Sequence, residues 1–140
     1  MSENLDFVRA IFADWERGDF SSAGWADPEI EFVLTDGPEP GNWSGLAAMA
    51  QAMRGWLSGW ENYRLEGEQY RELDDERALV FWNQSGRGKA SGLELAQRWP
   101  KAASLFLIRD DKVTSLVTYF DRERALAELG LAPKGIRRDS

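Results

Sequence analysis

The chain has 140 residues, 43% hydrophobic and 29% charged, which is typical of one globular domain large enough to bury a core. It contains neither histidine nor cysteine, which excludes disulfides, the usual zinc sites and catalytic sets built on histidine or a thiol. Proton transfer would need Asp, Glu, Lys, Tyr or water. The net charge of -7 argues against a nucleic-acid partner, and no calcium-loop spacing is present, so we predict neither a metal site nor a cofactor.

No apolar run approaches the roughly 20 residues that a membrane-spanning helix needs. The start of the chain, MSENLDF, is acidic and lacks the apolar segment of a signal peptide. We therefore predict no membrane association and a cytoplasmic location.

The first segments of the chain predict two helices. Apolar residues from Leu5 to Trp15 recur at steps of three and four, the pattern of an amphipathic helix, and Gly18 is placed to end it. Asp19 is a candidate N-cap for a short second helix through Ala23.

A strand and a long helix follow. The segment EIEFVLTD, residues 29–36, predicts a strand, and the segment DGPEPGN, residues 36–42, predicts a loop. Ser44 is a candidate N-cap for a helix over residues 46–60, in which apolar residues again recur at helical spacing.

From Tyr63 onward the period of the apolar residues changes to two. This predicts four strands, at about Tyr63–Leu73, Arg77–Ser85, Leu93–Arg109 and Val113–Phe120. Pro100 marks an expected bulge in the third of them. Asp121 is placed to cap a last helix that ends at Gly130. Residues 132–140 have little apolar content and are predicted to form a flexible tail.

These elements predict a single α+β domain over residues 1–131, with a mostly antiparallel sheet. A curved sheet with helices packed across its concave face encloses a cone-shaped cavity. Such cavities are common small-molecule sites.

With these elements in place, the chain resembles the nuclear transport factor 2-like superfamily, in its SnoaL-like or ketosteroid-isomerase-like branch. The segments that carry the resemblance are ERGDF, ADPEIEFV, NWSGLAAMAQAM, GRGKASGLELAQRW and FLIRDDKVTSLVTYFDRERALAELGL. The resemblance implies a cone whose concave face holds a ligand and whose convex face builds a dimer. Members include isomerases, epoxide hydrolases, cyclases and non-catalytic binding proteins, so the fold alone does not give the function.

The acid–base sets of the superfamily are not intact in this sequence. By similarity, the Asp-Arg-Asp set of limonene epoxide hydrolase-like members falls at Gln84, Trp82 and Thr118. The tyrosine and the acid of the ketosteroid isomerase oxyanion hole fall at Ile11 and near Ser104. None of these side chains titrates near neutral pH.

Asp36 is the candidate catalytic carboxylate that remains. The ketosteroid isomerase base falls near Val33 by similarity, and Asp36 lies three residues further on, at the start of the loop over the cavity mouth. Asp36 is also at the favoured first position of a β-turn in DGPEP, so a structural role is the alternative.

Strand alternation places neutral polar groups on the inward face of the sheet. Gln84, Ser104 and Thr118 are expected to converge in an aromatic cavity, or else each satisfies a neighbour or a buried water. The tryptophans of this set are either ligand contacts or core. The complete set of candidate ligand-binding residues is Trp15, Trp56, Trp60, Trp82, Gln84, Ser104, Thr118 and Phe120.

We therefore predict a protein that binds a small, mostly apolar molecule carrying a carbonyl, hydroxyl or ether group. One alternative is an isomerase, cyclase or hydrolase with Asp36 as its base, and another is an accessory or assembly protein without chemistry. A homodimer is predicted through the convex sheet face, where four residues would supply apolar surface: Leu105, Leu107, Val117 and Tyr119.

Overall fold

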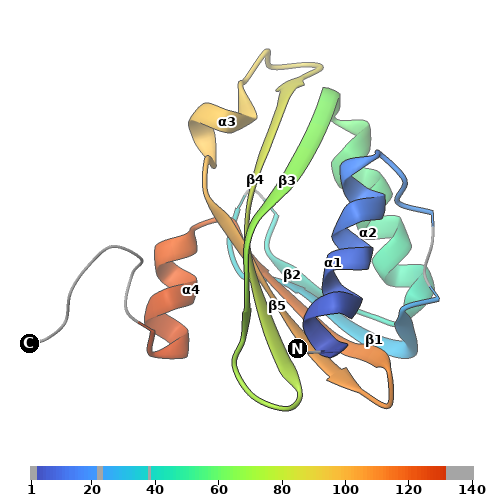
Figure 1. Ribbon diagram of the computed structural model, residues 1–140. Helices are drawn as coiled ribbons and strands as arrows, with labels where there is room; N and C mark the ends of the chain where they lie inside the picture. The colour runs from blue at the N-terminus through green and yellow to red at the C-terminus, as the bar shows by residue number, and fades with distance from the viewer. Residues whose placement is uncertain (1–2, 22–23, 38, 132–140) are drawn as a thin grey trace, which may run out of the picture.

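A computed structural model describes residues 3–21, 24–37 and 39–131, and four helices and six strands lie among them (Figure 1). In chain order they are α1 (Glu3–Glu16), β1 (Ala26–Leu34), β2 (Gly41–Ser44), α2 (Leu46–Ser58), β3 (Trp60–Glu72), β4 (Arg77–Gly88), α3 (Leu95–Arg98), β5 (Ala102–Arg109), β6 (Lys112–Tyr119) and α4 (Arg122–Leu129). No helix in the described ranges is long and apolar enough to cross a membrane.

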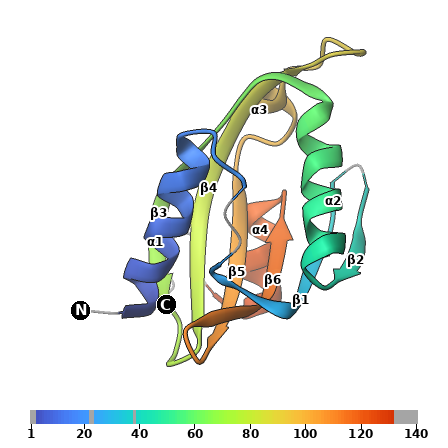
Figure 2. The ribbon, with the colours of Figure 1, turned by 90° about the vertical axis from the view of Figure 1, so that its right-hand side faces the viewer.

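The strands form one open, curved sheet in the order β2-β1-β6-β5-β4-β3 (Figure 2). Neighbouring strands are antiparallel except β1 and β6, which pair in parallel, so the sheet is mixed. The register shifts twice between β3 and β4 and once between β5 and β6. Such irregularities bend a sheet, and this one curves around a concave face. The predicted α+β class with a curved sheet is confirmed.

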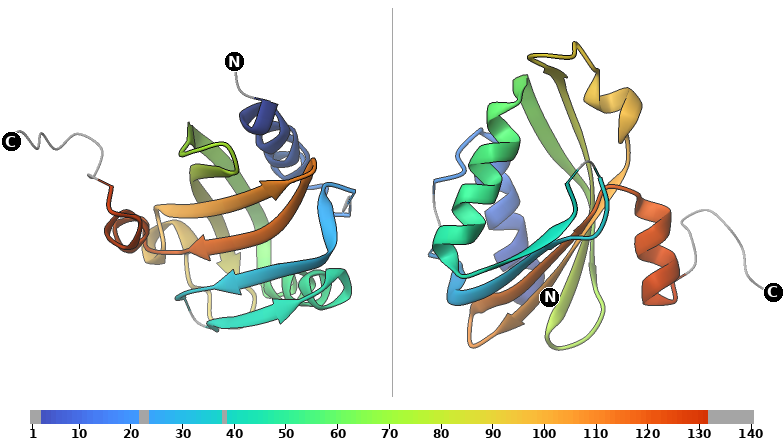
Figure 3. Two further views of the ribbon diagram at one scale, coloured as in Figure 1. Left: turned by 90° about the horizontal axis from the view of Figure 1, so that it is seen from below. Right: turned by 180° about the vertical axis from the view of Figure 1, so that it is seen from behind.

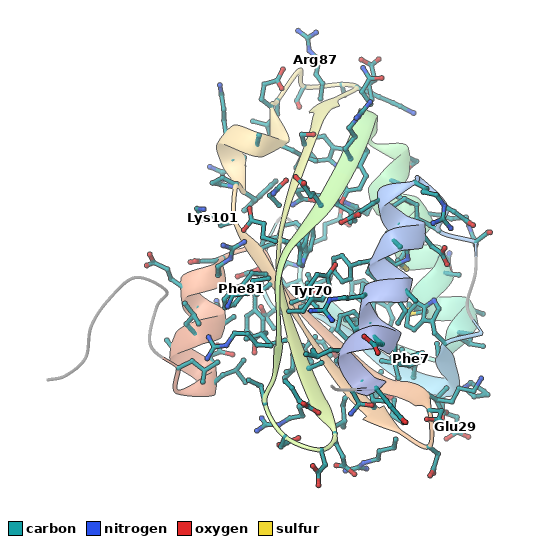
Figure 4. All side chains as sticks on the ribbon, viewed as in Figure 1. Phe7, Glu29, Tyr70, Phe81, Arg87 and Lys101 are labelled. Atoms are coloured by element: carbon teal, nitrogen blue, oxygen red, sulfur yellow. The ribbon has the colours of Figure 1, made fainter. Side chains whose placement is uncertain are left out.

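The helices lie on both sides of the sheet. Helices α1 and α2 cross the concave face, as predicted, whereas α4 packs on the convex side (Figure 3). Figure 4 shows the same division among the labelled side chains, with Tyr70 on the side of α1 and Phe81 on the side of α4. Tyr70 packs with the α1 residues of the main core, and Phe81 belongs to a second apolar cluster that includes Leu126 of α4.

Helix α4 covers part of the surface that we assigned to a dimer. Tyr119 is buried in the second cluster, and Leu105 and Val117 pack against it. Three of the four residues predicted to face a partner subunit therefore contact apolar groups of their own chain. The homodimer stays a prediction, and its apolar surface is smaller than the sequence suggested.

The main core lies between the concave face and the two helices above it. The predicted stripe on α1 is confirmed, because its buried residues are Val8, Ile11, Phe12 and Trp15. The helix ends where expected: Gly18 has φ +85°, a conformation that glycine adopts without strain.

Two predicted helix starts are wrong. Asp19 caps no helix, because its carboxylate accepts hydrogen bonds from the backbone N–H and the hydroxyl of Ser21 (3.0 and 2.7 Å), an Asx turn. Residues 20 and 21 are not helical, and residues 22–23 lie outside the described residues. Ser44 ends β2 and donates to the Glu31 carboxylate, while Gly45, at φ +92°, is the N-cap of α2.

The predicted long strand Leu93–Arg109 is also wrong, and α3 interrupts it. Leu95 is fully buried, whereas the rest of α3 is exposed, so one apolar side chain anchors a short surface helix. Pro100 lies between α3 and β5 and makes no bulge. Trp60, expected at the end of the second long helix, begins β3 instead, because α2 ends at Ser58 and Gly59 caps it. The tail predicted for residues 132–140 lies outside the described residues.

The hairpin of β5 and β6 sets the register on which the site depends. Asp110 and Asp111 form its two-residue turn with φ of 52° and 61°, the signs that a type I′ turn requires. The register then shifts between Leu107 and Ile108, since Thr114 is an extra residue on β6. The Thr114 hydroxyl donates to the Leu107 carbonyl (3.3 Å). Because of this bulge, Ser104 lies opposite Thr118 rather than opposite Val117.

Candidate ligand site

A cavity lies between the concave sheet face and helices α1 and α2. The space in which the centre of a water-sized molecule fits has a volume of about 80 Å³. The whole empty space, which includes the open mouth of the cavity, is about 620 Å³. An isolated water needs only about 10–15 Å³ by the first measure, so the cavity has room for a small organic molecule. Residues of α1, of α2 and of the sheet line the cavity, and each lining side chain is uncharged.

Six of the eight residues predicted to contact a ligand line this cavity: Trp15, Trp56, Trp82, Ser104, Thr118 and Phe120. Trp60 is not in the lining, and its ring packs against that of Trp56 with centroids 5.1 Å apart. Gln84 is not in the lining either, although it is 1% exposed and faces the same side of β4 as Trp82.

Sequence reasoning missed several lining residues. Phe12 and Met53 were assigned only to helical stripes, and Tyr63 only to the start of a strand. The signal that could have identified Tyr63 is its alternation with Leu65, because both side chains line the cavity from the same strand face.

The polar floor of the cavity is made by β4, β5 and β6. The Trp82 indole N–H donates to the Ser104 hydroxyl oxygen (3.0 Å), and the hydroxyl oxygens of Ser104 and Thr118 are 2.9 Å apart. All three residues are at most 6% exposed. The indole N–H and the two hydroxyls together carry three hydrogens, and the two hydrogen bonds use only two of them. One hydroxyl hydrogen has no acceptor among the interactions of the described residues, and both Ser104 and Thr118 are residues of the cavity lining.

A second polar group lies further along β4. The Tyr63 hydroxyl donates to the Gln84 side-chain oxygen (2.9 Å). The side-chain nitrogen of Gln84 is buried and has no hydrogen-bond partner in the described part of the chain. Burial raises the pKa of Tyr63 above its ordinary value of 10.0, against the smaller effect of the Trp56 hydrogen bond. Tyr63 is therefore a neutral donor at physiological pH.

The raised pKa values of three tyrosines predict how the free energy of unfolding changes at alkaline pH. Burial is the first cause of a raised pKa for Tyr63, Tyr70 and Tyr119. A raised folded-state pKa means that the unfolded state loses its protons first. The stability from this difference is fully present below the unfolded pKa and is lost as pH rises from there through the folded-state pKa. We expect the free energy of unfolding to fall above about pH 10. Urea denaturation from pH 8 to 11 measures this, and Tyr63→Phe should make the fall less steep.

Asp36 is not among the residues that line the cavity. Its side chain binds the backbone at the junction of β6 and α4. Its carboxylate accepts hydrogen bonds from the backbone N–H of Phe120 (2.6 Å) and of Asp121 (3.3 Å), where β6 ends and α4 begins. The next residue, Gly37, has φ +89°, and a Cβ there would lie 2.7 Å from the Phe120 ring. Asp36 thus has a structural role at the junction of β6 and α4, and it is not among the described residues that line the cavity.

We expect Asp36→Ala to lower the free energy of unfolding by about 1–3 kcal/mol, because it leaves two backbone N–H groups without their acceptor. Asp36→Asn keeps one acceptor oxygen and should lose less. Urea denaturation of both variants measures the difference. Unchanged stability in Asp36→Ala would contradict the structural role.

Comparisons with known proteins support the fold. No family model matches the chain, and no curated protein matches it. Among solved structures, 182 chains match, and SnoaL-like proteins are among them. A nuclear transport factor 2-like protein of unknown function from Burkholderia pseudomallei is 17% identical, with a TM-score of 0.70 over 91% of this chain and 97% of that one.

Two further matching structures were determined with a small molecule. TerC, co-crystallized with polyporic acid, is 22% identical, with a TM-score of 0.68 over 91% of this chain and 98% of that one. A protein with a ketosteroid isomerase-like fold from Catenulispora acidiphila, in complex with trimethylamine, is 14% identical, with a TM-score of 0.67 over 94% of this chain and 96% of that one. At these identities the likeness shows the cone fold alone and leaves the activity open.

Proposed function

We propose that the protein binds a small, mostly apolar molecule in the cone cavity and holds an acceptor oxygen of that molecule, such as a carbonyl, at Ser104 and Thr118. The observation that carries this proposal is the surplus hydroxyl hydrogen on a floor that is otherwise aromatic and aliphatic. A buried donor without an acceptor is unfavourable by about 1–3 kcal/mol, and a ligand oxygen would remove that penalty.

The character of the lining supports a neutral ligand. Among the described residues that line the cavity there is no Asp, Glu, Lys or Arg, so a charged ligand would lose its hydration without gaining a partner. Structures of this fold with polyporic acid and with trimethylamine support the choice of a small molecule as the partner. Binding without chemistry is the reading that we favour, because none of the carboxylates in the described part of the chain lines the cavity, where a base would have to act.

The test uses probes of one shape that differ in their acceptors. Para-diacetylbenzene carries a carbonyl at each end of one ring, and para-diethylbenzene is a hydrocarbon of the same outline. In the double variant Ser104→Ala/Thr118→Val, both hydroxyls are lost with little change in volume. We expect it to bind para-diacetylbenzene roughly tenfold more weakly, the factor for one hydrogen bond to a buried donor. The affinity for para-diethylbenzene should be unchanged.

Isothermal titration calorimetry measures the affinity of each probe for the native protein and for the variant. The ratio of the two affinities is taken separately for each probe, so the different hydration of the two probes cancels. Near-ultraviolet circular dichroism confirms that the variant keeps its packed tryptophans. Equal losses for the two probes, or no binding of either probe to the native protein, would contradict the proposal.

A further inference from the structure

A second hollow, which we call the outer groove, lies outside the cone cavity between α3 and α4. It is open and has a volume of about 730 Å³, and most small-molecule sites have volumes of roughly 300–1,000 Å³. Three segments supply most of its lining: residues 36–37, 98–101 and 120–124. Figure 4 shows Lys101, from the second of them, between α3 and α4. Phe120 lines both the outer groove and the cone cavity, so the two spaces share a wall.

Basic residues gather in the outer groove of a chain whose net charge is -7. Four basic and three acidic residues line it. Arg122 and Arg124 each form an ion pair, at 2.7 and 3.1 Å, with a carboxylate outside the groove. Arg98 and Lys101 are exposed, and neither side chain makes an ion pair or a hydrogen bond with a residue that the structure describes. These two cations are therefore available to a ligand.

Two of the three acidic residues are already compensated by the backbone. The Asp36 carboxylate accepts two backbone N–H groups at the end of β6, and the Asp121 carboxylate accepts one at 3.0 Å and caps α4. Donors of this kind offset the charge of a carboxylate at the start of a helix. Glu123, in the first turn of α4, is the third. The uncompensated charges of the described lining are thus two cations and one carboxylate, and their sum favours an anion.

An aromatic surface adjoins the two cations. Trp99 is partly exposed, and the Arg98 guanidinium carbon lies 5.3 Å from the centre of the Trp99 ring, a cation–π contact. A guanidinium in such a contact still has N–H donors at its edge for a carboxylate. The same ring packs against Phe120 and Trp56, with centroids 5.4 and 6.3 Å apart, which fixes its position. The groove therefore presents an ordered ring beside two unpaired cations.

We propose that the outer groove is a second ligand site, separate from the cone cavity, and that it takes a small aromatic carboxylate. The ring of the ligand contacts Trp99, and its carboxylate pairs with Arg98 and Lys101. This site does not depend on the proposed function, because Phe120 is the one described residue that the two linings share and the cone cavity takes a neutral molecule.

The experiment compares 2-naphthoate with 2-naphthamide, which has nearly the same shape and no charge. The double variant Arg98→Gln/Lys101→Met removes both cations and keeps side chains of similar length. We expect it to bind 2-naphthoate roughly fivefold more weakly, the factor for losing two exposed ion pairs. The affinity for 2-naphthamide should stay within about twofold. Isothermal titration calorimetry measures these affinities.

The double variant Arg87→Gln/Lys89→Met is the matched control. It makes the same change of net charge at two exposed residues that do not line the outer groove. Figure 4 shows Arg87 well apart from Lys101. This variant should bind 2-naphthoate within about twofold of the native protein, because distant exposed charges are screened by salt. Equal losses in the two double variants would overturn the site, since the whole charge of the protein would then explain the binding.

A variant of the cone cavity separates the two sites. Ala52 lines the cone cavity and not the outer groove, so Ala52→Phe should leave the affinity for 2-naphthoate unchanged. If this variant loses 2-naphthoate, the naphthoate occupies the cone cavity and the second site is wrong, while the proposed function is untouched. If the native protein binds 2-naphthoate as expected but not para-diacetylbenzene, the proposed function fails and the outer groove stands.

A measurement on the native protein needs no variant of the cations. The indole N–H signal of Trp99 should shift in nitrogen–proton correlation spectra when 2-naphthoate is added, and Trp99→Phe identifies that signal by its loss. An unmoved Trp99 signal, or no binding of 2-naphthoate to the native protein, would overturn the proposal.

Discussion

Phe12→Ala is expected to lower the free energy of unfolding by about 3–5 kcal/mol, the range for deleting a buried phenylalanine ring. Phe12 is 1% exposed, and its ring centroid lies 5.0 Å from that of Trp15, 5.9 Å from Tyr70 and 6.0 Å from Phe106. Phe12 therefore joins α1 to both β3 and β5. Urea denaturation followed by tryptophan fluorescence measures the loss.

Phe7→Ala is the matched control, since Phe7 is on the same helix but only partly buried at the edge of the core. The same deletion there removes fewer contacts and should have a clearly smaller effect. Equal losses in the two variants would contradict the placement of the core between α1 and the concave face.

Ala52→Phe is expected to abolish binding of para-diacetylbenzene, with a loss of more than about a hundredfold, and to leave the fold intact. Ala52 of α2 lines the cavity, so a ring at this position occupies the space that the ligand needs. The change in helix propensity is only about 0.5 kcal/mol, and the new ring fills an existing void instead of displacing packed atoms. Titration calorimetry and a thermal melt measure the two quantities.

Ala47→Phe is the control for this variant, because Ala47 is on the same helix and is exposed. It carries the same propensity change and should bind the probe like the native protein. Retained binding in Ala52→Phe would place the ligand outside the cavity, and lost binding in Ala47→Phe would show that any aromatic residue on α2 disturbs the fold.

The main elements of the fold follow from local pattern. The stripe on α1 and the alternation on β5 and β6 follow the period of each element, so periodicity alone placed Phe106, Leu116 and Thr118 on the buried concave side. The two-residue acidic turn between β5 and β6 was also predictable, because only a tight hairpin joins two alternating runs so closely. Where the pattern depends on one anchoring side chain, as for Leu95 in α3, the sequence suggested a strand and the structure has a helix.

The polar groups of the site were only half predictable, for a physical reason. Alternation indicates that Ser104 and Thr118 face inward, but their contact depends on the extra residue Thr114, and nothing in the local sequence marks that bulge. The partner of Gln84 likewise depends on an irregular register before Tyr63. Asp36 was ambiguous because a loop carboxylate can turn inward or hold backbone N–H groups, and tertiary packing decides between these.

The most direct test of ligand binding in the cone cavity is a crystal structure of the protein soaked with para-diacetylbenzene. We expect the ring between α1, α2 and the concave sheet face, with one carbonyl oxygen within hydrogen-bond distance of the Ser104 or Thr118 hydroxyl. Electron density for the diketone only on the outer surface, with the side chains around Trp82 closed over the cavity, would contradict it and make Thr118 a core residue.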